Sequence, residues 1–494
     1  MYLGIDLGTS EVKVLLMDAA QRVVGVAHAP LAISRPQAQW AEQDPADWWR
    51  ATLAAIGALA ASHPRELAAL RGIGLSGQMH GAVLLDASGA VLRPAILWND
   101  MRSSAECAEL ERRAPQLRQI TGNLAMPGFT APKLLWVARH EPKLFRRTAT
   151  VLLPKDYLRY LLTGEFISDL SDASGTLWLD VGRRDWSDAM LAACGLDRSH
   201  MPRLVEGSAP AGVLKEELAR AWGIVTPVLL AGGAGDNAAS AVGMGVVAQG
   251  EGFISLGTSG VFFTANDAYR PDPAQGLHTF CHALPGQWHQ MGVMLSAASC
   301  LRWVTQLSHA AGEAALLAEI EGAGEAARTS APLFLPYLSG ERTPHNDPDA
   351  SGVFFGLRHD TDRALLGYSV LEGVAFGLRD SYLALQAAGG APTRAALVGG
   401  GSQSRYWARL LASALGMPLS LNSGGQVGAA LGAARLGLLA AEPELTVAGV
   451  CFAPPVLEVI APDPQWQAAL LPRFERYRAL YGSLKPLFKE SGAT

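Results

Sequence analysis

The stretch "GIDLGTS" at residues 4–10 returns as "FISLGTS" at residues 253–259, half the chain later. Aligned over ten positions, "IDLGTSEVKV" (5–14) and "ISLGTSGVFF" (254–263) share six residues. Apolar residues alternate with small or polar ones around each Gly-Thr-Ser, which predicts a strand, a tight turn and a second strand. The repeat therefore predicts two halves of one plan, each beginning with a β-hairpin.

Helices and short apolar strands are expected to alternate after each hairpin. In the first half, "DWWRATLAAIGALAA" (47–61) has helical spacing and "LRGIGLSG" (70–77) is typical of a buried strand. In the second half, "LGYSVLEGVAFGLRDSYLALQAAG" (366–389) predicts a long helix and "AALVGGG" (395–401) a strand ending in glycines. This alternation indicates an α/β fold with mainly parallel sheets.

The length of 494 residues favours two domains. Glycine density rises between the halves, in "VGMGVVAQGEG" (242–252), which is a candidate hinge. We expect an N-terminal domain over residues 1–245 and a C-terminal domain over residues 246–494, facing one another.

The two Gly-Thr-Ser turns are candidate phosphate-binding sites. Each offers unhindered backbone N–H groups and two hydroxyls in one place, and opposing turns can hold neighbouring phosphates of one nucleotide. Only the first turn follows an aspartate, Asp6, because Ser255 stands at that position in the second. One carboxylate is enough for the Mg²⁺ that accompanies the phosphates. Lys13 is expected to place a positive charge near the transferred phosphoryl group.

Other nucleotide-binding signatures are weak in this chain. No GxxxxGK[ST] motif occurs, which excludes the P-loop class. A GxGxxG pattern covers residues 72–77, but the preceding "PRELAALR" (64–71) looks helical, and a dinucleotide site needs a strand there. We therefore interpret this pattern as unrelated to dinucleotide binding.

Two polar groups follow apolar strands and are candidates for chemistry. Asp236 in "VLLAGGAGDN" (228–237) stands where a strand ends and a helix begins, the usual place for active groups in open α/β sheets. A helix cap is the alternative reading of Asp236, although it does not explain the surrounding glycines. Gln78, Met79 and His80 follow the strand at 70–77, and an amide with an imidazole suits a polyhydroxylated ligand. A purely structural histidine is the alternative for His80.

Composition excludes several classes of protein. Hydrophobic residues make up 49% and charged residues 17%, which indicates a compact globular protein. The net charge of −5, without a basic cluster, argues against nucleic-acid partners. Five cysteines without a CxxC spacing favour reduced thiols in a cytoplasm. No signal peptide is expected, and the apolar stretch at 427–441 is too short for a membrane span and contains Arg435.

Longer motifs carry a resemblance to a known family. They are "YLGIDLGTSEVKV", "GLSGQMHG", "RPAILWNDMR", "GFTAPKLLWVARH", "LLPKDYLRYLLTGEF", "GGAGDNAASAVG", "FLPYLSGERTPHND" and "LVGGGSQSRYW". Over essentially its whole length the chain resembles the FGGY carbohydrate kinases, and "GQMHG" with "GERTPHN" is similar to the members that phosphorylate xylulose. In the family's second signature, Leu365 replaces a polar residue at an expected helix start.

The resemblance implies two actin-like (ribonuclease H-like) α/β domains with the active-site cleft between them. It implies that Asp236 is the general base, that Met79, His80 and Asp236 contact the sugar, and that Gln78 and Asn237 are neighbours of the sugar. Residues matching positions that hold ATP are Thr9, Ser10, Thr258, Gly400, Gly401 and Ser404. Asp6 and Asp236 are the candidate Mg²⁺ ligands, and Lys13 stands where some members have arginine.

The implied reaction transfers the γ-phosphate of ATP to D-xylulose, in a cytoplasmic homodimer. The alternatives are an FGGY kinase acting on another ketose or polyol such as ribulose, an actin-like nucleotide-dependent switch, and a sugar-binding module without catalysis.

Overall fold

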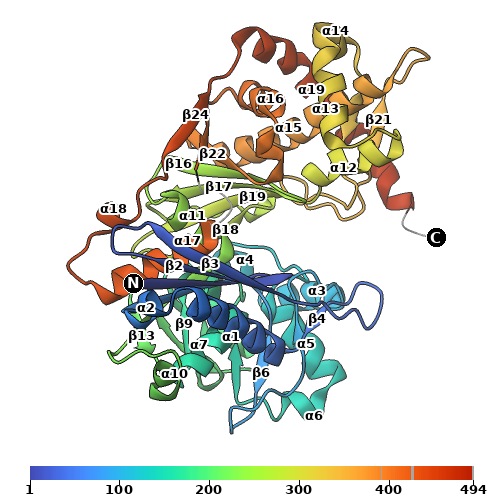
Figure 1. The fold of residues 1–494 in the computed structure, drawn as a ribbon. Helices are drawn as coiled ribbons and strands as arrows, with labels where there is room; N and C mark the ends of the chain where they lie inside the picture. The colour runs from blue at the N-terminus through green and yellow to red at the C-terminus, as the bar shows by residue number, and fades with distance from the viewer. Residues whose placement is uncertain (391, 424–427, 492–494) are drawn as a thin grey trace.

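Two seven-stranded sheets form the centres of two lobes in the computed structural model (Figure 1). The structure describes residues 1–390, 392–423 and 428–491. Residue 427, which begins the predicted apolar stretch, and residues 492–494 of the predicted second domain lie outside this part. The first half of the chain, blue to green in Figure 1, forms one lobe, and most of the second half, green to red, forms the other.

The first sheet has the strand order β13-β14-β5-β1-β2-β3, with β15 also paired to β5. Its strands are β1 (Tyr2–Leu7), β2 (Glu11–Met17), β3 (Val23–Pro30), β5 (Gly72–Gly77), β13 (Pro210–Val213), β14 (Leu229–Ala231) and β15 (Ala234–Gly235). The second sheet has the order β18-β19-β17-β16-β22-β23-β24. Its strands are β16 (Glu251–Leu256), β17 (Gly260–Asn266), β18 (His278–Cys281), β19 (Trp288–Met294), β22 (Arg394–Val398), β23 (Leu419–Asn422) and β24 (Val456–Ile460).

Both sheets repeat one topology. Each begins with an antiparallel hairpin, β1–β2 or β16–β17, whose first strand pairs in parallel with the next long strand, β5 or β22. A further parallel strand, β14 or β23, and an antiparallel edge strand, β13 or β24, complete the series. The predicted duplication of an α/β plan is confirmed, including both hairpins that flank the Gly-Thr-Ser turns.

Helices cover the sheets. Helix α1 follows Asp44, whose side chain accepts a hydrogen bond from the Ala46 N–H, and it buries a stripe that includes Trp48 and Ile56 against the first sheet. The helices of the first half are α1 (Pro45–Ser62), α2 (Pro64–Ala68), α3 (Ser104–Arg113), α4 (Leu117–Thr121), α5 (Thr130–His140), α6 (Pro142–Phe145), α7 (Pro154–Thr163), α8 (Leu170–Ser174), α9 (Asp188–Ala193), α10 (Glu216–Ala221) and α11 (Asp236–Met244).

In the second half, helix α15 is the predicted long helix, and its first turn contains Leu365, whose N–H donates to the Asp362 side chain. Its neighbours in the core include α16 and α19. The helices of this half are α12 (Ala298–Leu307), α13 (Glu313–Gly322), α14 (Gly324–Ser330), α15 (Arg363–Ala387), α16 (Arg405–Leu415), α17 (Gly428–Ala441), α18 (Val447–Val450) and α19 (Pro464–Ser491).

Short two-stranded sheets lie outside the two central ones. They pair β4 (Glu42–Gln43) with β7 (Ala95–Ile96), β6 (Val83–Leu85) with β8 (Thr150–Leu152), β9 (Ile167–Asp169) with β12 (Arg203–Val205), β10 (Leu179–Asp180) with β11 (Asp185–Trp186), and β20 (Leu333–Leu335) with β21 (Val353–Phe355). None of the helices in the described part of the chain is both long and apolar enough to cross a membrane.

Helix α17 belongs to the second half of the sequence but packs against the first sheet, between α11 and strands β1 and β5 (Figure 1). The approach is so close that a Cβ on Gly74 would lie 1.8 Å from the Ala433 carbonyl oxygen, and one on Gly72 would lie 2.3 Å from that of Gly437. The first two glycines of the GxGxxG pattern therefore serve backbone packing against α17, and helix α2 precedes the pattern as predicted. The boundary at residues 245 and 246 stays a prediction.

Candidate active site

Two carboxylates meet at the carboxyl ends of strands β1, β5 and β15. Asp6 lies opposite Ser76 in the register of β1 and β5, and the Ser76 hydroxyl donates to Asp6 Oδ1 over 3.0 Å. Gly235 pairs with Gly77 at the end of β15, and Asp236 follows as the first residue of α11. The parallel pairing thus brings Asp6 and Asp236, which are distant in sequence, to one edge of the sheet.

Asp236 has a raised pKa and does not occupy the cap position of its helix. The N-cap position of α11 is Gly235, so the capping alternative does not describe Asp236. Asp236 Oδ1 accepts hydrogen bonds from the backbone N–H and the Nδ2 of Asn237, over 2.7 and 2.9 Å. Burial, and then the charge of Asp6, raise the pKa of Asp236 to about 6, against the opposing effect of those two bonds. In the described part of the chain, no protein group donates to its Oδ2.

The donor set around Asp6 suits a hard divalent cation. Burial raises the pKa of Asp6, while the Ser76 hydroxyl and the charge of Lys13 act in the opposite direction. Lys13 Nζ lies 3.4 Å from Glu11 Oε1. Mg²⁺ prefers carboxylate oxygens together with phosphate oxygens, and two neighbouring carboxylates of like charge are stabilised by a cation between them. Asp6 and Asp236 therefore fit the predicted Mg²⁺.

A cavity of about 230 Å³ lies between the two lobes. Asp6, Lys13 and Asn237 line it from the first lobe, and Ser255 and Gly399 line it from the second. Ser255 occupies the position that corresponds to Asp6 in the second hairpin, so equivalent residues of the two hairpins line the same cavity. The cleft that the resemblance implies is present at this place.

A larger cavity, of about 880 Å³, adjoins the first. Thr258, Gly400, Gly401 and Ser404, all predicted to hold the nucleotide, line it together. Leu256 and Gly400 line this cavity while their neighbours Ser255 and Gly399 line the smaller one, so the two spaces flank the end of the second hairpin. Ser404 is also the N-cap of α16, where its hydroxyl accepts from the Trp407 N–H over 3.2 Å. Leu301, Leu317 and Tyr406 add apolar surface.

The first Gly-Thr-Ser turn is held from behind by side chains. Thr9 Oγ1 donates to Gln78 Oε1 over 3.1 Å and accepts from the Trp98 indole over 3.0 Å. Gln43 Nε2 donates to the Thr9 carbonyl over 2.8 Å, and its Oε1 accepts from Gln78 Nε2 over 2.9 Å. The structure thus places Gln78 in the support of this turn, with 2% of its surface exposed. Ser10 is exposed, and the two cavities are not lined by Thr9 or Ser10.

His80 is fixed in one tautomer beside this support. Its Nδ1 donates to the Gly175 carbonyl over 2.7 Å, so Nε2 is left as an acceptor. Burial, and then the charge of Lys133, lower the pKa of His80 to about 3, which keeps the ring neutral. The residue adopts a left-handed φ of 71°, and its carbonyl accepts from Thr130 Oγ1 and from Lys133 Nζ, each over 3.1 Å.

Met79 lies between the region of His80 and that of Asp236, the predicted base. A Cβ on Gly235 would lie 2.8 Å from Met79 Sδ, and one on Gly175 would lie 3.0 Å from Met79 Cε. Met79 therefore packs against the residue that precedes Asp236. The predicted sugar residues and the predicted base are neighbours, although the two cavities described above are not lined by Met79 or His80.

Sequence reasoning missed three residues of this region. Gln43 had no local signal, since a glutamine in a two-residue strand has no distinctive pattern. Lys133 is fully buried and donates only to carbonyls, including those of His80 and Phe129. Arg342 comes from the second half of the chain, and its Nη1 donates to His278 Nε2 over 3.1 Å. The positive charge of Arg342 also lowers the pKa of His80, which places it near the predicted sugar residues. Lys133 and Arg342 each stand in a motif that carries the family resemblance, "GFTAPKLLWVARH" and "GERTPHN", and these motifs were the available signal for the two residues.

Known proteins resemble this chain over its full length. A family model described as the N-terminal domain of the FGGY family of carbohydrate kinases matches residues 1–243, and the model of the C-terminal domain of that family matches residues 252–441. The xylulose kinase of Escherichia coli (strain K12) is 53% identical over 487 residues, which cover 99% of this chain and 100% of the relative.

Solved structures agree with these matches. The crystal structure of a "xyloylose kinase" from Brucella ovis has a TM-score of 0.95 and 55% identity, covering 98% of this chain and 99% of that one. The xylulose kinase from Rhodospirillum rubrum has a TM-score of 0.91 and 32% identity, covering 99% of each chain.

Proposed function

Because this chain belongs to the FGGY family of carbohydrate kinases, we propose that it transfers the γ-phosphate of ATP to D-xylulose, giving D-xylulose 5-phosphate and ADP. The observation that carries the proposal is the place of Asp236. This half-buried carboxylate lies close enough to Asp6 to be affected by its charge, and it precedes Asn237, which lines the interlobe cavity. Met79 packs against Gly235, the residue before it. The relatives named xylulose kinase support the choice of sugar.

His80 and Asn237 are the proposed hydrogen-bonding partners of the sugar. The neutral His80 ring offers Nε2 as an acceptor for a hydroxyl, because its Nδ1 is engaged by the Gly175 carbonyl. Asn237 holds Asp236 Oδ1 and also lines the interlobe cavity. Gln78 acts one step away, by holding the Thr9 turn.

The nucleotide is proposed to extend from one lobe to the other. Its adenosine occupies the larger cavity beside Gly400, Gly401 and Ser404, and its phosphates reach the turns that contain Thr9, Ser10 and Thr258. Lys13 contributes positive charge from the wall of the interlobe cavity. Asp6 and Asp236 would hold the Mg²⁺, which would neutralise part of the negative charge of the phosphates.

Asp236 is proposed to accept the proton of the attacking hydroxyl. As the sugar oxygen bonds to the γ-phosphorus, the bond from that phosphorus to the leaving oxygen of ADP breaks, and the proton passes to Asp236 Oδ2. A carboxylate is a weak base toward an alcohol, so the transfer comes late, after bonding to phosphorus has acidified the oxygen. Positioning and charge neutralisation supply most of the acceleration.

A panel of ketoses and polyols, tested with ATP and Mg²⁺ in a coupled assay for ADP, checks the proposal. We expect D-xylulose to give the highest kcat/KM, and a preference for ribulose or another polyol would replace the proposed substrate. ADP release that no sugar stimulates would indicate a nucleotide switch. Asp236→Asn is expected to lower kcat by at least about 10³-fold while D-xylulose still binds in calorimetry, because the variant loses the base but keeps the shape.

We further propose a cytoplasmic homodimer without nucleic-acid or membrane partners. The net charge of −5 and the five cysteines, none of them in a disulfide in the described residues, support this setting. The dimer follows from the family resemblance alone, and light scattering of the purified chain tests it.

A further inference from the structure

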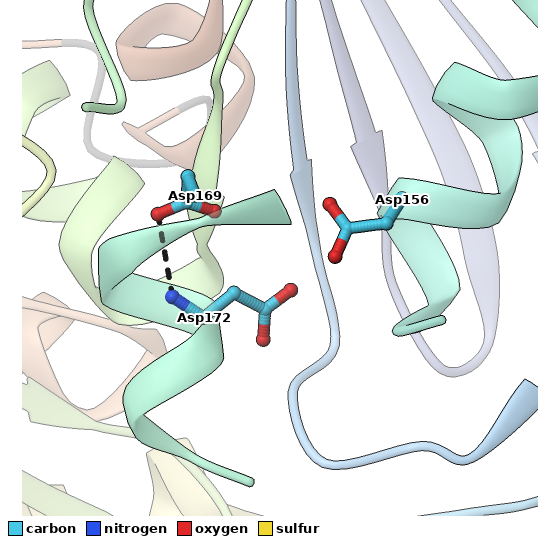
Figure 2. A group of neighbouring side chains, drawn as sticks. All are labelled: Asp156, Asp169 and Asp172. Carbon is cyan, nitrogen blue, oxygen red and sulfur yellow. Dashed lines mark hydrogen bonds between the residues drawn. The ribbon is translucent and has the colours of Figure 1, made fainter. Parts of the chain in front are cut away.

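A group of charged side chains is buried in the first lobe, away from the cavities described above. We call it the Lys155 cluster: it consists of Lys155, Asp156 and Arg159 on α7, Asp169 at the end of β9 and Asp172 on α8. Each of the five is 0% exposed. Figure 2 shows Asp156 arriving from one side and Asp169 with Asp172 from the other.

Lys155 takes the central place in the cluster. Its Nζ lies 2.6 Å from Asp156 Oδ1, 2.6 Å from Asp169 Oδ1 and 3.3 Å from Asp172 Oδ2. One carboxylate oxygen from each of the three aspartates lies within 4.8 Å of the other two, a spacing that a metal ion would require. An ammonium group already contacts all three, so the resident cation here is Lys155.

The charges of the cluster balance when Asp172 carries a proton. Two cations face three carboxylates, and an unbalanced charge in the protein interior is strongly unfavourable. Burial, with the charges of Asp156 and Asp169, raises the pKa of Asp172 well above its ordinary value against the effect of Lys155. Asp172 Oδ2 faces the Lys155 ammonium over 3.3 Å, and Asp172 Oδ1 accepts no hydrogen bond in the described part of the chain.

The cluster contacts both ends of the glycine-rich segment that leads to Asp236. Arg159 Nη2 donates to the Gly232 carbonyl, and the Gly235 N–H donates to Ser171 Oγ over 3.2 Å. Ser171 in turn donates its hydroxyl hydrogen to Asp169 Oδ2. The segment has no large side chains of its own to fix it, and Gly233 adopts a left-handed φ of 75°.

We propose that the Lys155 cluster is the positioning device of the catalytic base, acting on Asp236 through Arg159 and Ser171. The chain of contacts runs from Lys155 to Asp169, from Asp169 to Ser171, and from Ser171 to the residue before Asp236. Arg159 holds the other end of the segment from the same cluster. This inference rests on the proposed role of Asp236 as the base.

Ser171→Ala and Ser168→Ala form a matched pair that tests the inference. Both serines are buried and both donate to a cluster aspartate, Ser171 to Asp169 and Ser168 to Asp156 over 2.6 Å. Only Ser171 also accepts from Gly235. We expect Ser171→Ala to lower kcat about tenfold with KM for D-xylulose within about twofold, since one hydrogen bond to the segment is lost. We expect Ser168→Ala to keep kcat within about twofold of that of the unaltered protein, although it lowers Tm about as much as Ser171→Ala does.

The outcome is decided by comparing kcat and KM between the two serine variants. Equal kcat losses in both, or a loss in Ser171→Ala that appears in KM for D-xylulose instead of kcat, overturn the positioning role. If Asp236→Asn retains normal kcat, the role of Asp236 as the base is wrong. This result is different from the one that refutes the positioning role, so the two hypotheses are tested separately.

Discussion

At the scale of single residues, Asp236 joins two properties that a base for an alcohol needs. One oxygen is held by Asn237, and the other has no protein donor in the described part of the chain. The pKa of about 6 lies near neutral pH, where a carboxylate is ionised yet more basic than an exposed aspartate. The same strand ends bring Asp6 close enough for its charge to contribute to that pKa.

The raised pKa of Asp236 predicts an acid limb in the activity. The protonated acid cannot accept a proton, so kcat/KM is expected to fall about tenfold per pH unit below about pH 6 and to be level above it. Initial rates with D-xylulose in buffers of constant ionic strength measure this limb. A level profile down to pH 5, about one unit below the expected pKa, would contradict the assignment.

The contact between Lys133 and the His80 backbone predicts an effect of Lys133 on sugar binding. Its ammonium donates to the carbonyls of Gly128, Phe129 and His80, and burial lowers its pKa to about 7. Lys133→Met frees the strained His80 backbone, so KM for D-xylulose is expected to rise about tenfold with kcat within about threefold. Steady-state kinetics measure both, with Lys143→Met on the exposed side of α6 as the control. An unchanged KM would show that Lys133 acts on stability alone.

At the scale of elements, α17 explains the glycines that lie outside the turns. The helix lies against β1, β5 and α11 at backbone contact, which only residues without side chains allow. Gly243 of α11 faces Gly428 and Gly432 of α17 in the same way, since its Cβ would lie 2.0 Å from the Gly428 carbonyl oxygen. Small residues on four elements therefore form one packed layer that includes β1 and α11, the elements that carry Asp6 and Asp236.

Gly74→Ala tests this layer, with Gly57→Ala as its control. A Cβ on Gly74 collides with the Ala433 carbonyl, whereas one on Gly57, in α1, meets nothing within 4 Å. We expect Gly74→Ala to lower Tm by about 5 °C or more, because the backbones must separate. Gly57→Ala leaves Tm unchanged or raises it slightly, since alanine favours helix by about 1 kcal/mol. Differential scanning fluorimetry measures both, and equal Tm values would contradict the close packing.

At the scale of the whole molecule, each lobe presents one hairpin turn, and one interlobe cavity is lined by both hairpins. The larger cavity adjoins it from the second lobe. In the proposed mechanism the sugar binds in the first lobe and the adenosine in the second, so the two substrates react only when the lobes approach each other. The chain passes between the lobes after Met244 and again through α17, so these crossings are the places where a closing motion would be accommodated.

Closure predicts a ligand-dependent change in size. With D-xylulose and a non-hydrolysable ATP analogue together, the radius of gyration from small-angle X-ray scattering is expected to fall by a few per cent. Either ligand alone fills only part of the proposed site, so each is expected to have a smaller effect. A sugar that is not phosphorylated in the panel serves as the control. An unchanged radius with both ligands would mean that the lobes are already in their reactive arrangement.

The residues alone determined the plan of the fold and the region of the chemistry. The repeated Gly-Thr-Ser hairpins predicted two like α/β units, because alternation and turn residues are local signals that each strand carries in its own sequence. The position of Asp236 between a strand and a helix was likewise readable from its neighbours. Longer motifs then indicated the family, which the comparisons confirmed.

Only the tertiary structure decided which distant residues meet. The pairing of β1, β5 and β15 brings Asp6 to Asp236, and the packing of α17 accounts for Gly72 and Gly74. Gln78 likewise proved to support the Thr9 turn, because it hydrogen-bonds to Thr9 and to Gln43, a residue in none of the quoted motifs. Such contacts depend on strand register and helix packing across hundreds of residues, and local periodicity contains no information about either.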